Sequence, residues 1–207
     1  MIIQLVVEGH GEVRALPVLL RRLQEAAHAW QLEFGRPVRR KSSDLHSKDR
    51  FQQGLRIALS QPDCAAVLVL FDLDDDCPKE AFPRLATWAS EEARHVPSEV
   101  VLAHPEYEVW FLASVESLRG KRGIRGDAIS PTDPENRRNA KSALEERMVQ
   151  GRSYLETSDQ AALSSLFDME AAYRKSRSFR RMVKAFGELS RRAGCPIQEW
   201  PPRNWIQ

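Results

Sequence analysis

Three groups of acidic side chains follow three apolar segments of the chain, and their types and spacing could do chemistry together. The groups are Glu8; Asp72, Asp74 and Asp76; and Glu106 and Glu108. Several carboxylates that meet in a dry site cannot all stay ionised without a cation. Sites with only oxygen ligands favour a hard ion, Mg²⁺ first and Mn²⁺ second. Each group by itself could instead be a helix cap or a solvated turn.

The apolar segments that precede these groups have the pattern of buried strands. Residues 2–7 are rich in β-branched side chains, residues 65–71 are apolar throughout, and residues 99–103 form a third such run, with a weaker strand expected over 31–40. Helical spacing of apolar residues predicts helices over 14–29, 48–61 and 78–93. This alternation predicts an α/β fold over residues 1–113, with a mostly parallel four-stranded sheet flanked by helices. Because the carboxyl ends of parallel strands share one edge, we expect all three acidic groups there.

The rest of the chain, residues 114–207, has a different character. It carries 18 Lys and Arg against 12 Asp and Glu, whereas residues 1–113 carry 13 against 17. No strand pattern is visible, and we expect a helical, basic extension packed on the core, with helices around 135–150, 159–166 and 178–193. Its cations could hold phosphates, although a solvated helix face is the simpler alternative. The nucleic-acid contacts that we predict are Arg122, Arg125, Lys141, Arg177, Ser178, Arg180 and Arg181.

Within that extension, Ser178 precedes an apolar pattern with helical spacing. A serine at such a position is a preferred helix N-cap, and a helix N-terminus favours anions. We therefore expect Ser178 to cap the last long helix and to place backbone N–H groups near a phosphate.

The segment "VEGHGE", residues 7–12, connects the first strand to the first helix. Gly9 and Gly11 allow a turn without bulk, so Glu8 is expected at the sheet edge and Glu12 at the start of the helix, both facing the aspartates. A dinucleotide-binding fingerprint would need a third small residue where Arg14 stands. His10 could shuttle a proton or contact a phosphate, or it could be a solvent-facing turn residue.

Composition excludes several other classes of protein. The three cysteines are far apart in the sequence and predict neither a disulfide framework nor a zinc site. No apolar run is long enough to span a bilayer, and the first residues have the pattern of a strand and not of a signal peptide. We therefore expect a cytoplasmic protein with no membrane partner.

The ordered set of motifs resembles the TOPRIM domain of topoisomerases, primases and overcoming-lysogenization-defect (OLD) type nucleases. It is most similar to a bacterial TOPRIM-like family of unknown function, through "VEGHGE", "VLVLFDLDDD", "HPEYEVWFLA" and "SRSFRRM". The resemblance covers residues 2–113, and it extends to 186 when the last motif is included.

The resemblance implies roles for the acidic residues. Glu8 would be a metal ligand or proton-transfer group, Asp72 and Asp74 the principal Mg²⁺ ligands, and Asp76 a ligand directly or through water. Glu12 and Glu108 would serve a second metal, so one or two Mg²⁺ or Mn²⁺ ions are expected. With His10, the catalytic candidates are Glu8, Asp72 and Asp74.

The resemblance also implies a function. A topoisomerase needs a gate and a nucleophilic tyrosine on another domain, and this chain is too short for a gate. A bacterial-type primase brings a zinc ribbon, which three cysteines cannot build. What remains is a metal-dependent nuclease that hydrolyses DNA or RNA, in the setting of a bacterial anti-phage defence effector. Two alternatives are a phosphohydrolase of small phosphate esters and a non-catalytic subunit that works with a separate ATPase. The sequence does not determine the oligomeric state.

Overall fold

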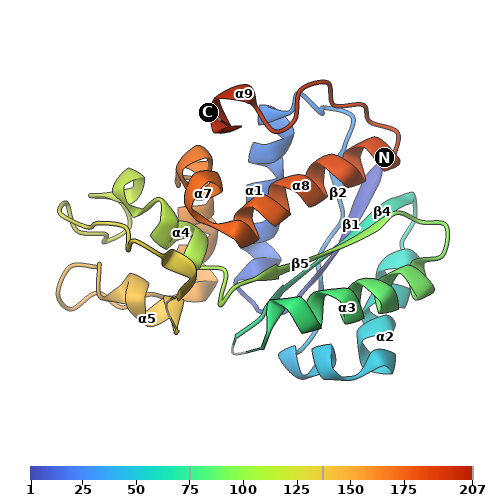
Figure 1. The fold of residues 1–207 in the computed structure, drawn as a ribbon, viewed down its shortest axis with the longest axis horizontal. Helices are drawn as coiled ribbons and strands as arrows, with labels where there is room; N and C mark the ends of the chain where they lie inside the picture. Colours follow the sequence, from blue (N-terminus) through green and yellow to red (C-terminus); the bar gives the residue numbers. More distant parts are fainter. Residues whose placement is uncertain (75, 137, 207) are drawn as a thin grey trace.

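The computed structural model describes residues 1–74, 76–136 and 138–206, and its centre is a parallel β-sheet (Figure 1). The strands are β1 (Ile2–Val7), β2 (Glu33–Phe34), β3 (Val38–Arg39), β4 (Cys64–Asp72) and β5 (Ser98–Ala103). Their order is β2-β1-β4-β5, with β3 also paired to β1, and every pairing is parallel. The expectation of an α/β fold with a mostly parallel sheet is confirmed.

The sheet has five strands and not four, because the weak strand expected over 31–40 is broken into β2 and β3. Glu33 and Phe34 pair with the start of β1, and Val38 and Arg39 pair with its end. Between them Gly35 approaches β1 so closely that a Cβ would lie 1.8 Å from the side-chain oxygen of Gln4. Pro37 follows and has no N–H to donate to a strand ladder. One edge of the sheet is therefore interrupted.

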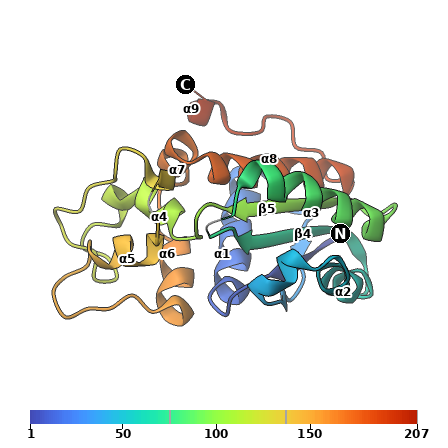
Figure 2. The ribbon, with the colours of Figure 1, turned by 60° about the horizontal axis from the view of Figure 1, so that its bottom comes forward.

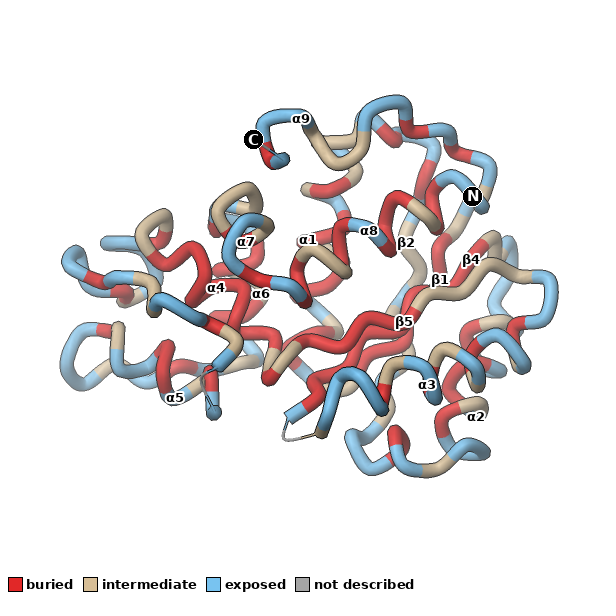
Figure 3. Tube along the Cα trace, in the orientation of Figure 1, coloured by how far each residue is buried: buried red, intermediate tan, exposed pale blue. Residues whose placement is uncertain are grey.

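Two layers of helices cover the sheet (Figures 1 and 2). The helices α1 (Glu12–Ala26) and α8 (Arg177–Arg192) lie on one face, and α2 (Lys48–Leu59) and α3 (Pro78–Ala93) lie on the other. Alternate residues of β4 serve the two faces, since Leu68 packs in the α1 and α8 core while Val69 packs in the α2 and α3 core. Burial on both faces explains why β1, β4 and β5 are apolar (Figure 3).

The part of the extension that precedes α8 lies beyond the carboxyl ends of the strands, next to the short helix α4 (Val109–Ala113) (Figures 1 and 2). Besides α8, the helices of the extension are α5 (Ala140–Glu145), α6 (Ala161–Ser164), α7 (Met169–Lys175) and α9 (Arg203–Ile206). Shorter helical turns are η1 (Ser42–His46), η2 (Val115–Leu118), η3 (Pro134–Asn136) and η4 (Glu156–Gln160), of which η1 belongs to the core. The extension shares one hydrophobic core with α1, and the guanidinium of Arg22 lies 5.2 Å from the ring centre of Phe167.

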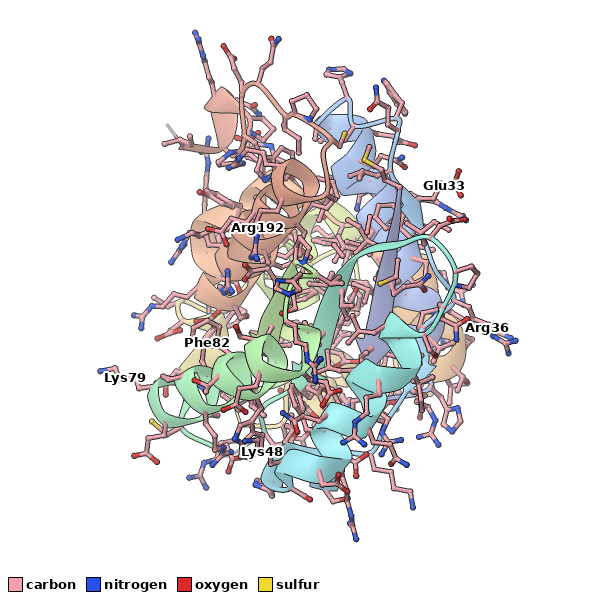
Figure 4. All side chains as sticks on the ribbon, turned by 90° about the vertical axis from the view of Figure 1, so that its right-hand side faces the viewer. Glu33, Arg36, Lys48, Lys79, Phe82 and Arg192 are labelled. Atoms are coloured by element: carbon pink, nitrogen blue, oxygen red, sulfur yellow. The ribbon has the colours of Figure 1, made fainter. Side chains whose placement is uncertain are left out.

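Charged side chains cover the free edge of β5. Glu99 pairs with Arg181 and with Arg192, both from α8, and the Arg181 guanidinium lies 4.9 Å from the ring centre of Phe82 on α3. Figure 4 shows Arg192 and Phe82 on either side of this strand. Charges at an exposed sheet edge hinder pairing with another chain.

Across the three described ranges, no helix is long and apolar enough to cross a membrane.

Candidate functional site

The carboxyl ends of β1 and β4 and the segment after β5 bring acidic side chains from all three predicted groups together. A Glu8 carboxylate oxygen accepts a hydrogen bond from the backbone N–H of Asp72 at 3.2 Å. The Asp72 carboxylate in turn accepts one from the backbone N–H of Tyr107 at 2.9 Å. Asp72 is buried and Glu108, at the start of α4, is completely buried. We call Glu8, Glu12, Asp72 and Glu108 the carboxylate cluster.

Two polar residues of the extension complete the inner side of this cluster. The Gln160 amide donates to one oxygen of Glu12 at 2.7 Å and to one oxygen of Glu108 at 3.1 Å. The Tyr154 hydroxyl donates to that same Glu108 oxygen at 2.7 Å. The second carboxylate oxygens of Glu12 and Glu108 are buried and have no hydrogen-bond partner among the described atoms. Unsatisfied buried carboxylate oxygens cost free energy and require an explanation.

The two glycines of "VEGHGE" make this packing possible. A Cβ at Gly9 would lie 2.2 Å from the Glu12 carboxylate, and a Cβ at Gly11 would lie 2.1 Å from the Gln160 side-chain oxygen. A side chain at either position would therefore displace Glu12 or Gln160 from its present place. His10, between them, is exposed in the turn.

Lys141 of α5 is a cation that faces these carboxylates. Its ammonium lies 2.9 Å from a Glu156 oxygen, 3.5 Å from a Glu106 oxygen and 3.8 Å from an Asp72 oxygen. Its backbone N–H also donates to Glu106 at 3.0 Å. Burial lowers the pKa of Lys141, but the charges of Glu108 and Asp72 outweigh burial, and the net effect raises this pKa. Lys141 is therefore charged and forms ion pairs with the acidic residues.

One lysine does not balance the negative charge of the cluster. Burial raises the pKa of Glu8 to about 7, and the charges of Asp74 and Glu12 add to this effect. Burial also raises the pKa of Glu108 to about 7, against the lowering effect of Lys141. The pKa of Asp72 lies well above its ordinary value because of burial and the charges of Glu108 and Glu12. The cluster therefore favours protons or another cation near neutral pH.

The aspartates after β4 lie at the outer side of the site. Asp74 is exposed in a turn with φ of 52°, and its backbone N–H donates to the carbonyl of Pro105 at 2.9 Å. The Asp76 carboxylate lies 3.8 Å from the ring nitrogen of His46, whose side chain is exposed, while that of Asp76 is partly exposed. Asp75, in the middle of this segment, is outside the described residues.

The described part of the chain does not present a ready-made metal centre. Among residues 1–74, 76–136 and 138–206, no three His, Cys, Asp or Glu side chains are arranged to hold an ion. Asp72, Glu8, Glu12 and Glu108 lie at one edge, as the sequence predicts, but their oxygens do not converge on one point. Binding of an ion would therefore need side-chain rotation.

Several predicted nucleic-acid contacts have partners within the protein. Arg122 pairs with the buried carboxylate of Asp159 at 2.7 Å, and Arg181 pairs with Glu99. Arg180 donates to the carbonyl oxygens of Tyr173 and Arg174, and Arg125 lies 3.4 Å from Asp127. Arg177 is exposed at the start of α8.

The expectation that Ser178 caps this helix is wrong. Ser176 is the N-cap, since its hydroxyl accepts from the backbone N–H of Phe179 at 3.0 Å, and α8 begins at Arg177. Ser178 is buried one residue inside the helix and accepts a hydrogen bond from the Trp110 indole at 3.0 Å. Two serines with the spacing S-x-S are equally good sequence candidates for a cap, and tertiary packing distinguishes them.

Sequence reasoning missed Tyr154, Glu156 and Gln160 as members of the site. All three come from the extension, about 50 residues after Glu108, and no local motif marks them. Only their position against the carboxylate cluster shows their role.

Residues 7–186 match a protein family described as "Domain of unknown function (DUF4276)". The match covers most of the chain, so the protein belongs to this family. It includes both the strand-end carboxylates and the part of the extension that contacts them. Comparison with curated proteins and with solved structures finds no match.

Proposed function

We propose that the carboxylate cluster is the catalytic centre of a divalent-cation-dependent nuclease of TOPRIM type. The observation that carries the proposal is a group of four carboxylates, gathered from two strand ends and two helix starts. Glu12, Asp72 and Glu108 are buried, Glu8 is half-buried, and the described residues do not balance their charge. Such a group at the carboxyl edge of a parallel sheet lies where α/β proteins bind ligands. Perturbed carboxyl groups of this kind are typical of functional sites.

The residues that are present fit a hard divalent ion. Glu12 and Glu108 each have one buried carboxylate oxygen without a partner, and the available donors are all oxygen atoms. Asp72 and Glu108 would hold a first ion, with Glu12 or Asp74 available to a second, and Glu8 would remain beside them for proton transfer. Mg²⁺ and Mn²⁺ suit such a set.

The chemistry divides between the ion and the protein. A bound divalent cation would stabilise the negative charge that develops on phosphate oxygens during hydrolysis. Glu8, with a pKa raised to about 7, can accept or donate a proton near neutral pH, as a general acid–base catalyst must. Lys141 can turn from Glu156 toward an anionic substrate, because its side chain is about one-third exposed. Gln160 and Tyr154 hold Glu108 in place.

Nuclease assays with single- and double-stranded DNA and RNA, in Mg²⁺ or Mn²⁺, test this proposal. Asp72→Asn should reduce cleavage to the level without enzyme. Glu146→Gln, which changes an exposed carboxylate at the C-cap of α5, is the matched control and should cleave normally. Calorimetric titration with Mn²⁺ in the absence of substrate should show binding to the wild type and loss of binding in Asp72→Asn. Cleavage that survives Asp72→Asn would contradict the proposal.

One observation favours a second candidate, a non-catalytic subunit that works with a separate ATPase. Lys141 already supplies a positive charge to the site, and the described residues form no ready-made ion site. For such a subunit, Mn²⁺ titration at millimolar concentration would show no binding, and an ATPase would copurify with the chain. Hydrolysis of a small phosphate ester without any cleavage of polynucleotide would instead support a phosphohydrolase.

A further inference from the structure

A basic hollow lies at the end of β3, outside the part of the chain where the sequence predicts phosphate contacts. The hollow has a volume of about 440 Å³. Its lining residues are Arg39, Arg40, Lys41, Ser43, Arg50 and Gln53, and Asp44 is its single acidic member. Four cations against one carboxylate give the hollow a net charge of +3, in a half of the chain that is acidic by composition.

The hollow begins beside the carboxylate cluster. β3 runs parallel to β1, Arg39 pairs with Val7, and the backbone N–H of Arg40 donates to the Val7 carbonyl at 2.7 Å. Glu8 directly follows Val7, so Glu8 and Arg40 follow the carboxyl ends of two neighbouring parallel strands and lie at the same edge of the sheet. The chain after β3 continues into η1, and its last residue, His46, lies 3.8 Å from Asp76 in the segment that follows β4. Two contacts therefore place the hollow at the same rim as the acidic site.

The cations of the hollow have two different roles. Arg40 is occupied, because its guanidinium donates to Asp44 at 2.9 Å and to Gln53 at 2.9 Å. Asp44 is therefore neutralised locally, and Arg40 forms a fixed wall. Arg39, Lys41 and Arg50 are exposed, and none of the described carboxylates lies within ion-pair distance of them. These three cations are available to an external anion.

We propose that this hollow binds the phosphate backbone of a polynucleotide next to the bond that the carboxylate cluster cleaves. This inference rests on the proposed nuclease function and names a substrate-binding surface for it. An uncompensated carboxylate cluster repels a polyanion, so a nuclease needs cations beside the site to hold the strand. Exposed arginine and lysine side chains bind backbone phosphates without regard to sequence, and the hydroxyl of Ser43 can add a neutral hydrogen bond. The inferred path of the strand runs from the hollow, past the end of β1, to the carboxylate cluster.

Binding of a fluorescein-labelled 20-nucleotide single strand, measured by anisotropy in EDTA, tests this inference without requiring catalysis. The hollow variant combines Arg39→Gln, Lys41→Gln and Arg50→Gln. The matched control removes the same charge elsewhere, with Arg21→Gln, Arg36→Gln and Arg94→Gln, all exposed and outside the hollow. Figure 4 shows Arg36 pointing outward from the side of the sheet opposite α3. Thermal melting confirms that both variants are folded.

The hollow variant should bind at least about 10-fold more weakly than the control variant at 50 mM salt. The slope of log K against log salt should also fall by about 0.7 for each phosphate that the variant no longer neutralises. Mononucleotide at an equal phosphate concentration should not displace the strand, since the hollow is expected to act on several linked phosphates.

Three outcomes would overturn the inference. Equal affinities of the hollow and control variants, with a wild type that binds and cleaves, would contradict the inference and leave the nuclease proposal standing. Displacement by mononucleotide would make the hollow a site for small anions and not for a strand. A wild type that neither binds nor cleaves polynucleotide would contradict both proposals.

Discussion

Asp159 and Gln160 are neighbours in the chain and both are completely buried, but they belong to two acidic sites of opposite character. The Asp159 carboxylate accepts from Arg122 and Arg152 at 2.7 Å and from the backbone N–H of Leu155 at 3.0 Å. Gln160 faces the carboxylate cluster, where buried oxygens lack partners. The first site is neutralised by the protein itself and the second is not. A buried charge is thus a structural feature when the fold neutralises it, and a candidate binding site when the fold does not.

The largest expected effect distinguishes the two sites by stability. Asp159→Ala should lower the free energy of unfolding by about 3 kcal/mol, because Arg122 and Arg152 lose their shared partner. Their side chains are 41% and 34% exposed, which keeps the cost at the lower end of the range for buried pairs. Glu108→Gln, which removes a charge from the unbalanced site, should not destabilise the metal-free protein at pH 8. Urea denaturation in EDTA measures the free energy of unfolding of both variants. If only Glu108→Gln lowered it strongly, the Glu108 site would be the structural one, and the comparison would be reversed.

A second prediction concerns pH. The pKa of Glu108 rises from an ordinary value of 4.5 to about 7 on folding. Between pH 4.5 and pH 7, the folded protein therefore keeps a proton on Glu108 that the unfolded chain has released. This contribution is fully present below pH 4.5 and is lost as the pH rises through 7. Glu108 alone should therefore make the metal-free protein about 2 kcal/mol more stable at pH 5 than at pH 8, and Glu8 acts in the same direction. Glu108→Gln should make the profile shallower, with the remaining slope due to Glu8 and Asp72, whose pKa values are also raised, whereas Asp159→Asn should leave the slope in place.

A third prediction tests the packing of Gly11. The backbone of Gly11 is helical, with φ of −65°, so alanine is not excluded by conformation. Its Cβ would nevertheless meet the side-chain oxygen of Gln160 at 2.1 Å, and we expect Gly11→Ala to cost about 1.5 kcal/mol. Gln160→Ala in the same chain should recover most of this loss, as a double-mutant cycle would show. Additive losses would mean that the two residues do not meet.

The smallest effect concerns Lys141. Lys141→Met should lower the free energy of unfolding of the metal-free protein by about 1 kcal/mol at pH 8, because this side chain is partly exposed and its ion pairs are screened. The same change should strengthen Mn²⁺ binding about 5-fold in a calorimetric titration, since a competing positive charge is removed. Weaker binding of Mn²⁺ would show that the lysine supports the site and does not compete for it.

Much of the core could be predicted from the sequence. The apolar runs 2–7 and 65–71 became β1 and β4, and the rule that parallel strands share a carboxyl edge correctly placed Glu8 beside Asp72. Glu108 was expected at the same edge and is indeed a completely buried neighbour. These inferences succeeded because hydrophobic periodicity and strand direction are local properties with consequences for the whole sheet.

The basic residues could not be sorted in the same way. Arg122 and Arg39 are equally basic in the printed sequence, but Arg122 pairs with the buried Asp159 whereas Arg39 is exposed in a hollow. The difference depends on partners far away in the chain, 37 residues away in the case of Arg122. A count of charges by segment therefore indicated the extension, whereas the exposed cations that line the hollow, Arg39, Lys41 and Arg50, come from the acidic part of the chain.

The sequence by itself determined the order of strands and helices along the chain and the edge of the sheet at which the carboxylates lie, because both follow from local pattern and chain direction. Tertiary structure alone decided which charges are neutralised, which serine caps α8, and that Gln160, Tyr154 and Lys141 complete the site. The physical reason is that the state of a charge depends on burial and on the nearest opposite charge, and both are properties of three-dimensional packing.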